Sequence, residues 1–319
     1  MDNLLNIFFK SKSKSKSKTK KTKTKTRKRK NKNKKGGTKT FKTLRCHPSK
    51  KRLHKSIPSC YDSDDLNKLK NAWNRKYPSH KIIDTCPIKI WSFLKNAYQH
   101  KCDRESCWIN ELHLDLDMID DTFAPEAPEH WKKNPNAWLS DADIRNVMQQ
   151  YEETYPCFLF LGPSSIDYYK KLSDGNCVCN RLCNFNLKDE IEKHKIKKIG
   201  VVFNTDPHTR GGEHWISLFI DIPDRLIYFF DSVGSSPPDE VKRFIKTVTE
   251  QGEKLNIKFK FEYNRKPHQK QNTECGVYSI YFIIHMLRDD IDGDFIKRTD
   301  KLTDRYIEQY RKIFFNDDL

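Results

Sequence analysis

A long apolar run near the C-terminal end constrains this chain more than any other feature. Residues 277–287 follow Cys275 and Gly276 and are apolar nearly all round, with a polar loop before them and charged residues after them. Such a run predicts a buried helix. Cys275 then lies in its first turn, where unpaired N–H groups and the helix dipole favour an anion such as a thiolate. Cys275 is therefore a candidate nucleophile, although most free cysteines are simply small buried hydrophobes.

Two aromatic and β-branched runs upstream of this helix predict an antiparallel hairpin. They span residues 215–221 and 226–231, with a short turn between them. Because a hairpin brings the outer ends of its strands together, we expect His214 and Asp231 to be neighbours. A carboxylate beside an imidazole holds its tautomer, and an imidazole beside Cys275 accepts its proton. The three residues thus have the types that covalent catalysis needs.

The loop before Cys275 offers two candidate donors to an oxyanion. Gln269 and Gln271 both precede Cys275 on this loop. The side-chain amide of either residue, together with the backbone N–H of Cys275, could point at the oxyanion of a tetrahedral intermediate. Spacing alone does not decide between them. Each of these residues taken singly has a plain structural explanation, but their joint order around a hairpin and a helix start favours a catalytic set.

The other periodic segments predict an α+β fold. Further strands are expected at residues 157–161, 199–203 and 257–263. Helices are expected at residues 65–73, 88–94, 140–153, 237–250 and 302–315. We expect a central mixed, mostly antiparallel sheet with the Cys275 helix packed across it.

The net charge of +18 belongs to one end of the chain. Residues 10–55 hold 23 Lys or Arg and no Asp or Glu, so residues 1–55 carry +22 with Asp2 included, and residues 56–319 carry −4. Because its first forty residues offer little to bury, we expect residues 1–45 to be a disordered basic arm. Its cations predict nuclear targeting or sequence-independent contact with nucleic acid phosphates. A solvated, solubilising arm is the alternative.

Ten cysteines do not by themselves indicate disulfides in a chain of this length. The first nine residues hold only a brief apolar run, and no segment approaches the ~20 apolar residues of a membrane span. We therefore expect a soluble, intracellular protein with reduced thiols and no membrane partner. Cys102 and Cys107 have the spacing of half a zinc site, but no second pair accompanies them, so we expect no metal and no other cofactor.

These residues together resemble the active-site signature of the SUMO/sentrin-specific cysteine proteases, whose relatives include the adenovirus maturation protease. The matching residues are His214-Trp215, Phe230-Asp231-Ser232, Gln269 and Glu274-Cys275-Gly276, and Trp138-Leu139-Ser140-Asp141 resembles the family's Trp-Leu-Asn-Asp element. The resemblance covers roughly residues 137–290. With its Lys-rich arm, the whole chain resembles thiol proteases of giant DNA viruses.

The resemblance implies a papain-like or adenain-like core and a role for each matched residue. It makes Cys275 the nucleophile, His214 the base and Asp231 the group that orients the base. It also favours Gln269 over Gln271 as the oxyanion donor.

The resemblance further implies a substrate specificity. Trp138 and Trp215 would flank a narrow tunnel, and Asp141 would meet a basic residue of the substrate. A slot between two indole rings admits a chain without side chains, so a Gly-Gly ending passes and bulkier residues clash.

We expect three regions: the basic arm at residues 1–45, a helical extension at 46–136, for which the resemblance offers no counterpart, and a protease domain at 137–319. The expected function is a cysteine endopeptidase that cuts after Gly-Gly, in a ubiquitin-like modifier or in a viral precursor protein. We expect it in the virion, the host cytoplasm or the nucleus. The alternatives are a nucleic-acid-binding structural protein on an inactive protease scaffold, and an acyltransferase in which an amine resolves the thioester.

Overall fold

The computed structural model describes residues 41–50, 59–288 and 302–316. By its internal contacts the chain divides into residues 1–38 and residues 39–319, and every described residue belongs to the second unit. Almost all of the expected basic arm therefore lies outside the described residues. None of the described helices is long and apolar enough to cross a membrane.

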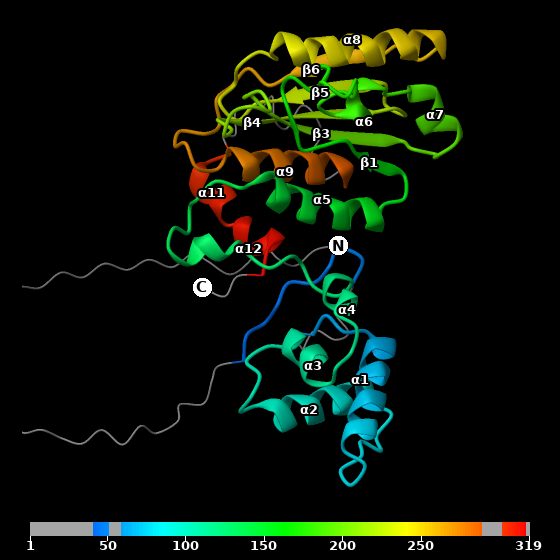
Figure 1. Cartoon of the computed structure of the whole chain (residues 1–319), viewed down its shortest axis with the longest axis vertical. Coiled ribbons are helices and arrows are strands. Elements are labelled where there is room, and N and C mark those ends of the chain that lie inside the picture. The colour runs from blue at the N-terminus through cyan, green and yellow to red at the C-terminus, as the bar shows by residue number, and fades with distance from the viewer. Residues whose placement is uncertain (1–40, 51–58, 289–301, 317–319) are drawn as a thin grey trace, which may run out of the picture. The chain divides into compact units, whose positions relative to one another are not determined.

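A mixed sheet carries the core of the second unit (Figure 1). Its strands are β1 (Phe158–Phe160), β2 (Ser164–Ser165), β3 (Lys198–Asn204), β4 (Trp215–Asp221), β5 (Leu226–Phe230) and β6 (Lys260–Tyr263). Their order is β1-β3-β4-β5-β6, with β2 also beside β3. The central pairs β3–β4 and β4–β5 are antiparallel, whereas β1 and β2 run parallel to β3, and β6 runs parallel to β5. The predicted mixed sheet is confirmed; β2 was not predicted, and β6 begins three residues later than expected.

Both faces of the central strands β3, β4 and β5 are covered, which explains why these strands are mostly apolar rather than alternating, whereas the edge strand β6 is partly exposed. One face packs against α9 (Cys275–Leu287) and the other against α8 (Asp239–Lys254) (Figure 1). In β5, Tyr228 and Phe230 belong to the apolar cluster on the α9 face. Ile227 and Phe229 belong to the cluster on the α8 face.

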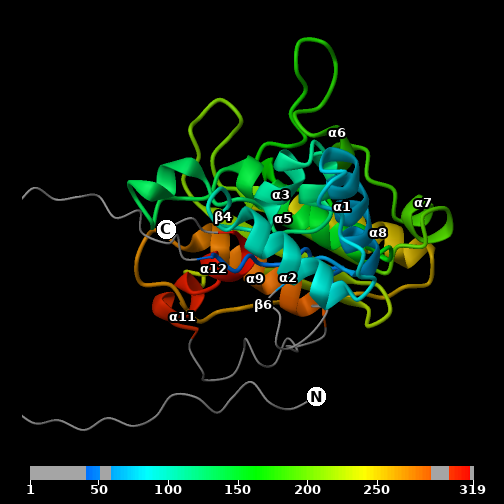
Figure 2. The same ribbon diagram turned by 90° about the horizontal axis from the view of Figure 1, so that it is seen from below.

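The predicted buried helix is confirmed as α9, in which every residue except His285 is buried. On the side away from the sheet, α9 contacts α5 (Asp141–Thr154) and α11 (Asp304–Glu308) (Figures 1 and 2). The predicted capping box opens α5, because Asp143 N donates to Ser140 Oγ at 3.2 Å and Ser140 N donates to Asp143 Oδ2 at 2.8 Å. The expected C-terminal helix consists of two short ones, α11 and α12 (Arg311–Phe314).

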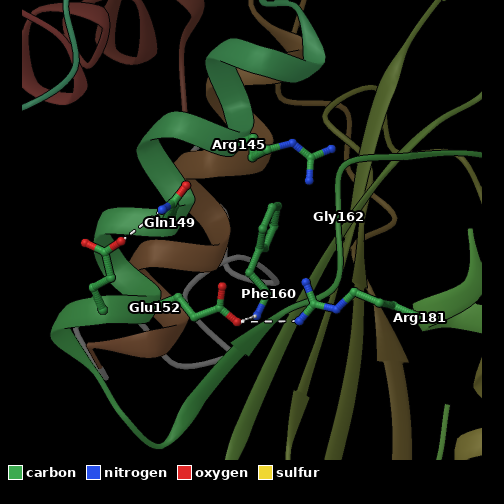
Figure 3. Close-up of a pocket in the computed structure, with 7 residues that line it drawn as sticks. Arg145, Gln149, Glu152, Phe160, Gly162 and Arg181 are labelled. Atoms are coloured by element: carbon green, nitrogen blue, oxygen red, sulfur yellow. Dashed lines mark hydrogen bonds and ion pairs between the residues drawn. The ribbon is translucent and has the colours of Figure 1, made fainter. Parts of the chain in front are cut away.

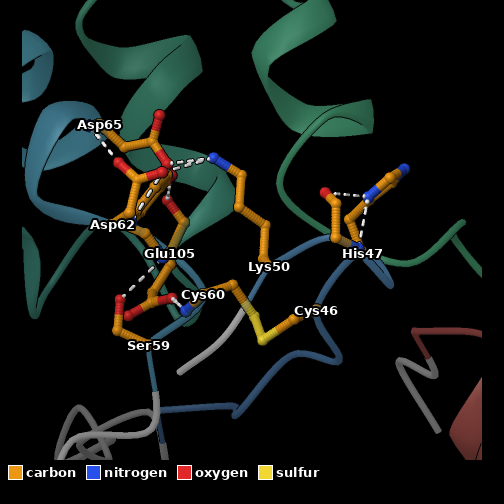
Figure 4. Close-up of polar contacts among 10 residues, drawn as sticks. Cys46, His47, Lys50, Ser59, Cys60, Asp62, Asp65 and Glu105 are labelled. Atoms are coloured by element: carbon orange, nitrogen blue, oxygen red, sulfur yellow. Dashed lines mark hydrogen bonds and ion pairs between the residues drawn. A yellow bond between two sulfur atoms is a disulfide. The ribbon is translucent and has the colours of Figure 1, made fainter. Parts of the chain in front are cut away.

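The region before residue 137 is largely helical. Its elements are α1 (Ser63–Lys76), α2 (Pro87–Tyr98), α3 (Ser106–Glu111), α4 (Asp117–Asp120) and the short 3₁₀ helix η1 (Glu129–Lys132). The helices predicted at residues 65–73 and 88–94 are thus confirmed as α1 and α2. Lys50 forms ion pairs with Asp62 at 2.9 Å and with Asp65 at 2.8 Å, at the start of α1 (Figure 4). These pairs fix the chain at the N-terminal end of that helix.

Three disulfides contradict the expectation of reduced thiols. They join Cys46 to Cys60, Cys102 to Cys107 and Cys177 to Cys183, and Figure 4 shows the first of them. The expectation rested on compartment and chain length, which say nothing of which cysteines meet in the fold. Cys102 and Cys107 are also the pair considered for zinc, and among the described residues no group of three or more His, Cys, Asp or Glu is arranged to hold a metal ion.

The last described residues link the region before residue 137 to the rest of the second unit. Asn316 Oδ1 accepts a hydrogen bond from Arg45 N, and Asn316 Nδ2 donates to Ala124 O at 2.7 Å. Asn316 N also donates to Pro125 O at 2.7 Å. One side chain and its backbone thus hold two distant stretches of chain together.

Candidate active site

The β4–β5 hairpin brings His214 and Asp231 together as its geometry predicts. His214 precedes β4, Asp231 follows β5, and Ser217 pairs with Phe230 in the antiparallel register between them. His214 Nε2 and Asp231 Oδ1 are 2.7 Å apart. Two residues that are 17 positions apart in the sequence are therefore hydrogen-bonded to each other.

The Asp231 carboxylate is buried and fixed by the chain that follows it. Val233 N donates to Oδ1 at 3.0 Å and Ser235 N donates to Oδ2 at 3.2 Å. Asn264 holds the backbone of Asp231 from both sides, because its Oδ1 accepts from Asp231 N at 2.9 Å and its Nδ2 donates to Asp231 O at 2.6 Å. These bonds aim the carboxylate at His214. Sequence analysis missed Asn264, for which no motif gave a signal.

Cys275 as well as Asp231 lies close enough to His214 to affect the pKa of its imidazole. Burial of the ring disfavours the charged form, but the hydrogen bond to Asp231 and the attraction of Asp231 and Cys275 outweigh burial, and they raise the pKa of His214 to about 9. Since Nε2 is engaged by Asp231, Nδ1 is the ring nitrogen left for the thiol. The imidazole is thus held between an acid and a thiol and favours its protonated form near neutral pH.

Cys275 is the first residue of α9, and only 2% of its surface is exposed. The glycine after it permits close packing of this helix end. A Cβ atom on Gly276 would lie 3.0 Å from Leu139 Cβ and 3.2 Å from Trp215 Cδ1. A larger residue would therefore crowd Leu139 and Trp215, which must shift by a few tenths of an ångström to admit it.

The loop before Cys275 buries Gln269 and exposes Gln271. Gln269 Oε1 accepts a hydrogen bond from Ser232 Oγ at 2.6 Å, and Nε2 donates to Gln271 O at 2.5 Å. Because a backbone carbonyl can only accept, the second bond fixes which end of the amide carries the N–H₂ group. His268 N and Gln269 N both donate to Ser232 O at 2.8 Å. The turn that carries Asp231 therefore also positions Gln269.

A buried ion pair holds Glu274, the residue before Cys275. Arg311 Nε donates to Glu274 Oε2 at 2.8 Å and Nη2 donates to Glu274 Oε1 at 3.0 Å, so the pair is bidentate. Arg311 also donates to Thr273 O at 3.1 Å and to Ala137 O at 2.8 Å, and its guanidinium lies over the Trp131 ring. Arg311 thus ties the nucleophile's loop to the residue before Trp138.

Asp304, at the start of α11, holds the same loop from another side. Its Oδ2 accepts from Lys270 N and from Gln271 N, each at 3.0 Å. Its Oδ1 accepts from Tyr278 Oη in α9 at 3.1 Å. Sequence analysis missed both Arg311 and Asp304, since a partner so far away in the chain leaves no local pattern.

The three expected substrate-binding residues lie around this loop and α5. The Trp138 side chain is exposed and its Nε1 donates to Asn272 O at 2.6 Å. Trp215 is buried and its Nε1 donates to Leu139 O at 2.9 Å. Asp141 is the first residue of α5, is exposed, and lines a pocket of about 230 Å³ together with Trp215. Both tryptophans are therefore attached to the segments that flank Cys275.

Proteins similar to this chain are named as thiol or cysteine proteases. The chain is 29% identical over 294 residues to a thiol protease of Acanthamoeba polyphaga mimivirus, covering 85% of this chain and 92% of that protein. It is 27% identical over 257 residues to a cysteine protease of African swine fever virus (strain Badajoz 1971 Vero-adapted), covering 73% of this chain and 91% of that protein. Both of these relatives are thus named for a peptidase activity of the cysteine type.

Residues 182–318 match the family model described as the Ulp1 protease family, C-terminal catalytic domain. The matched segment is therefore similar to the catalytic domain of that family. The matched range contains His214, Asp231, Gln269 and Cys275, whereas Trp138 and Asp141 precede it.

A solved structure shares the fold over a longer range. The crystal structure of a protease of African swine fever virus has a TM-score of 0.58 and 22% sequence identity, and the match covers 86% of this chain and 97% of that one. The matched 86% of this chain is longer than the segment 137–319. The shared fold therefore includes part of the region before residue 137, for which the resemblance in sequence offered no counterpart.

Proposed function

We propose that the protein hydrolyses peptide or isopeptide bonds with Cys275 as nucleophile, His214 as base and acid, Asp231 as the orienting group and Gln269 as oxyanion donor. The observation that carries this proposal is the hydrogen bond of His214 to Asp231, beside a cysteine at the first turn of a buried helix that helps to raise the pKa of His214. The roles follow from that order of contacts.

The chemistry proceeds in two halves. His214 takes the proton of the Cys275 thiol and becomes an imidazolium, and Cys275 Sγ forms a bond to the scissile carbonyl carbon. The carbonyl oxygen becomes an oxyanion that accepts hydrogen bonds from Gln269 Nε2 and Cys275 N. The tetrahedral intermediate expels the amine, which takes a proton from the His214 imidazolium and leaves a thioester. Neutral His214 then takes a proton from water, whose oxygen attacks the thioester and releases the carboxylate and the thiol. Asp231 keeps the ring oriented throughout.

The proposed substrate is a protein with Gly-Gly before the cut. Supporting this, Trp138 and Trp215 are attached to the two segments that enclose Cys275, and the nucleophile itself is almost fully covered. A substrate without side chains at the cut fits such a covered approach. Either a ubiquitin-like modifier or a viral precursor meets this requirement, and related proteins of African swine fever virus are named SUMO-1 cysteine proteases.

The experiment that tests this function uses a vinyl-sulfone probe built on a ubiquitin-like tail ending in Gly-Gly. We expect it to label the intact protein covalently and to leave the Cys275→Ser variant unlabelled. A second probe ending in Ala-Ala tests the narrow approach and is expected to react poorly. Equal labelling of wild type and Cys275→Ser would remove the proposed chemistry.

A separate proposal concerns residues 10–45 and rests on their sequence alone. Their Lys and Arg residues are proposed to bind nucleic acid without sequence preference, which would hold the enzyme near precursors in a virion or in the host cell. Deleting residues 10–45 is expected to abolish salt-sensitive DNA and RNA binding while leaving peptide cleavage nearly unchanged. Undiminished binding after the deletion would overturn the assignment.

A further inference from the structure

A pocket of about 450 Å³ opens between α5 and β1, away from the residues discussed so far (Figure 3). Arg145, Gln149 and Glu152 line it from α5, and Phe160 lies at its floor. Arg181, from α6 (Asn180–Cys183), enters from the other side. The pocket therefore combines two guanidinium groups with a buried aromatic ring.

The acidic groups of this pocket already have partners. Glu152 Oε1 accepts a hydrogen bond from Phe160 N at 3.0 Å and lies 3.8 Å from Arg181 Nη2. Glu153 Oε1 accepts from Gln149 Nε2 at 3.0 Å. Arg145 points into the pocket, and no hydrogen bond or ion pair joins it to another described residue. Glu153 Oε2 also lies 3.5 Å from His47 Nε2. Arg145 is thus the charged lining residue that has no such contact within the described ranges, and its guanidinium can pair with an anion.

Neighbouring residues line this pocket and the one beside Trp215. The first pocket is lined by Arg145 of α5 and by Gly162, and the second by Asp141 of α5 and by Pro163. Helix α5 and the chain at Gly162 and Pro163 thus line both pockets, one pocket after the other along the helix. We call the two pockets together the α5 groove, which runs from the residue after His214 along α5 to Arg181.

The two charges of the groove that lack partners are spaced for an extended chain. Asp141, like Arg145, has no hydrogen bond or ion pair from its side chain to any other residue in the described ranges. Four residues of helix separate the two, which is a rise of about 6 Å. An extended peptide presents every second side chain to the same side, at a repeat of about 6.6–6.8 Å. Two residues of a bound strand would therefore match them.

We propose that the α5 groove is a substrate subsite in which Arg145 pairs with a carboxylate of the substrate. The substrate binds in an extended conformation, and one of its residues faces Asp141. The Asp or Glu that pairs with Arg145 is two residues farther from the scissile bond than that residue. The proposal deepens the protease function above and rests on it. Arg181 contributes less, because Glu152 already neutralises it.

The test is a profile of cleavage sites in a pool of peptides from a digested proteome, read by mass spectrometry. Four proteins are compared: wild type, Arg145→Glu, Cys275→Ser and Lys246→Glu. Lys246 is a matched control, since it is an exposed cation on α8, on the opposite face of the sheet. Neither surface change is expected to alter the melting temperature much.

We expect wild-type cuts that depend on Cys275 to be enriched in an acidic residue at one fixed distance from the bond. At that position Arg145→Glu is expected to lose the acidic preference and to gain a basic one. Selected peptides should show a roughly three- to ten-fold loss of kcat/KM, mainly through KM, as for a partly exposed charge pair. Lys246→Glu should cleave as the wild type does.

Two results would overturn the proposal, and they differ. If cuts depend on Cys275 but Arg145→Glu retains the wild-type charge preference, the subsite is refuted and the protease function stands. If no cut depends on Cys275, the protease function fails and takes the subsite with it.

Discussion

The two helices that cover the faces of the sheet are buried in different ways. α8 buries one stripe of residues and exposes the rest, whereas α9 is buried on nearly all sides. The reason is that α9 lies between the sheet and a second layer that includes α5 and α11. An amphipathic sequence fits the first position, and only an apolar sequence fits the second.

The surroundings of the two helices also differ in polarity, so α8 contributes to stability and the start of α9 to the proposed chemistry. The described residues packed around α8 form an apolar cluster, while the end of α9 at Cys275 is surrounded by buried polar side chains. Several of those polar groups are hydrogen-bonded across segments, as in the pair of Glu274 with Arg311. A helix enclosed on all sides gives a nucleophile a rigid support, which a surface helix such as α8 does not provide.

The largest expected effect comes from the α9 face, in Asp231→Asn. A neutral amide does not stabilise the imidazolium and favours the wrong tautomer, so kcat should fall on the order of 10⁴-fold. Because the pKa of His214 is raised from 6.5 to about 9, the interactions of its imidazolium stabilise the fold fully below pH 6.5 and are lost as pH rises through 9. Asp231→Asn should move the alkaline loss of activity to lower pH, as measured by a pH–rate profile.

An unchanged alkaline limb in Asp231→Asn would contradict this account of His214. Asp224→Asn is a suitable control, because Asp224 lies in the turn at the opposite end of the same hairpin. We expect it to leave both kcat and the pH profile as they are in the wild type.

A pair of substitutions with similar cost in stability tests the comparison directly. Arg311→Met leaves Glu274 buried without its partner and should lower the free energy of unfolding by about 3–5 kcal/mol. Phe244→Ala, in the cluster of the α8 face, should cost about as much through a cavity. Only Arg311→Met is expected to lower kcat of the folded enzyme, because only it releases the nucleophile's loop. Denaturant unfolding and active-site titration measure the two quantities.

Adding Glu274→Gln to Arg311→Met removes the unpaired charge. The double variant should regain part of the stability without regaining kcat, since the bonds of Arg311 to Thr273 and Ala137 stay broken. Equal losses of kcat in Arg311→Met and Phe244→Ala would show that the two faces do not differ in this respect.

The smallest of these effects distinguishes two neighbouring glutamines. Gln269→Ala should lower kcat about 10²–10³-fold, as for the loss of one oxyanion donor. Gln271→Ala should change it little, because that side chain is exposed and its backbone carbonyl, which Gln269 uses, remains. A stopped assay of kcat on one Gly-Gly peptide measures both variants. A larger loss of kcat in Gln271→Ala than in Gln269→Ala would make Gln271 the oxyanion donor instead.

The elements that the sequence predicted well are those with local patterns. The apolar run of α9, the β4–β5 hairpin and the capping box of Ser140 each depend on residues close in sequence. The neighbourhood of His214 and Asp231 follows from the hairpin alone. A hairpin brings residues that are far apart in sequence into contact, so the pairing of His214 with Asp231 could be predicted without knowledge of the tertiary structure.

The rest of the site depends on contacts that no local pattern encodes. Asn264 reaches Asp231 from 33 residues away, and Arg311 reaches Glu274 from 37. The same holds for the three disulfides, since the cysteine count does not tell which thiols meet. The groove residue Arg145 was equally invisible, because an exposed arginine on a helix is ordinary until the opposite wall is known.

The position of Arg311 and Asp304 has a consequence for synthesis. Both follow Cys275 in the chain, and both hold the loop that carries Gln269 and Glu274. A nascent chain on the ribosome contains the nucleophile, the base and the orienting acid well before it contains these clamps. The loop that carries Gln269 and Glu274 is therefore fixed only after the chain that follows Cys275 has been synthesised as far as Arg311.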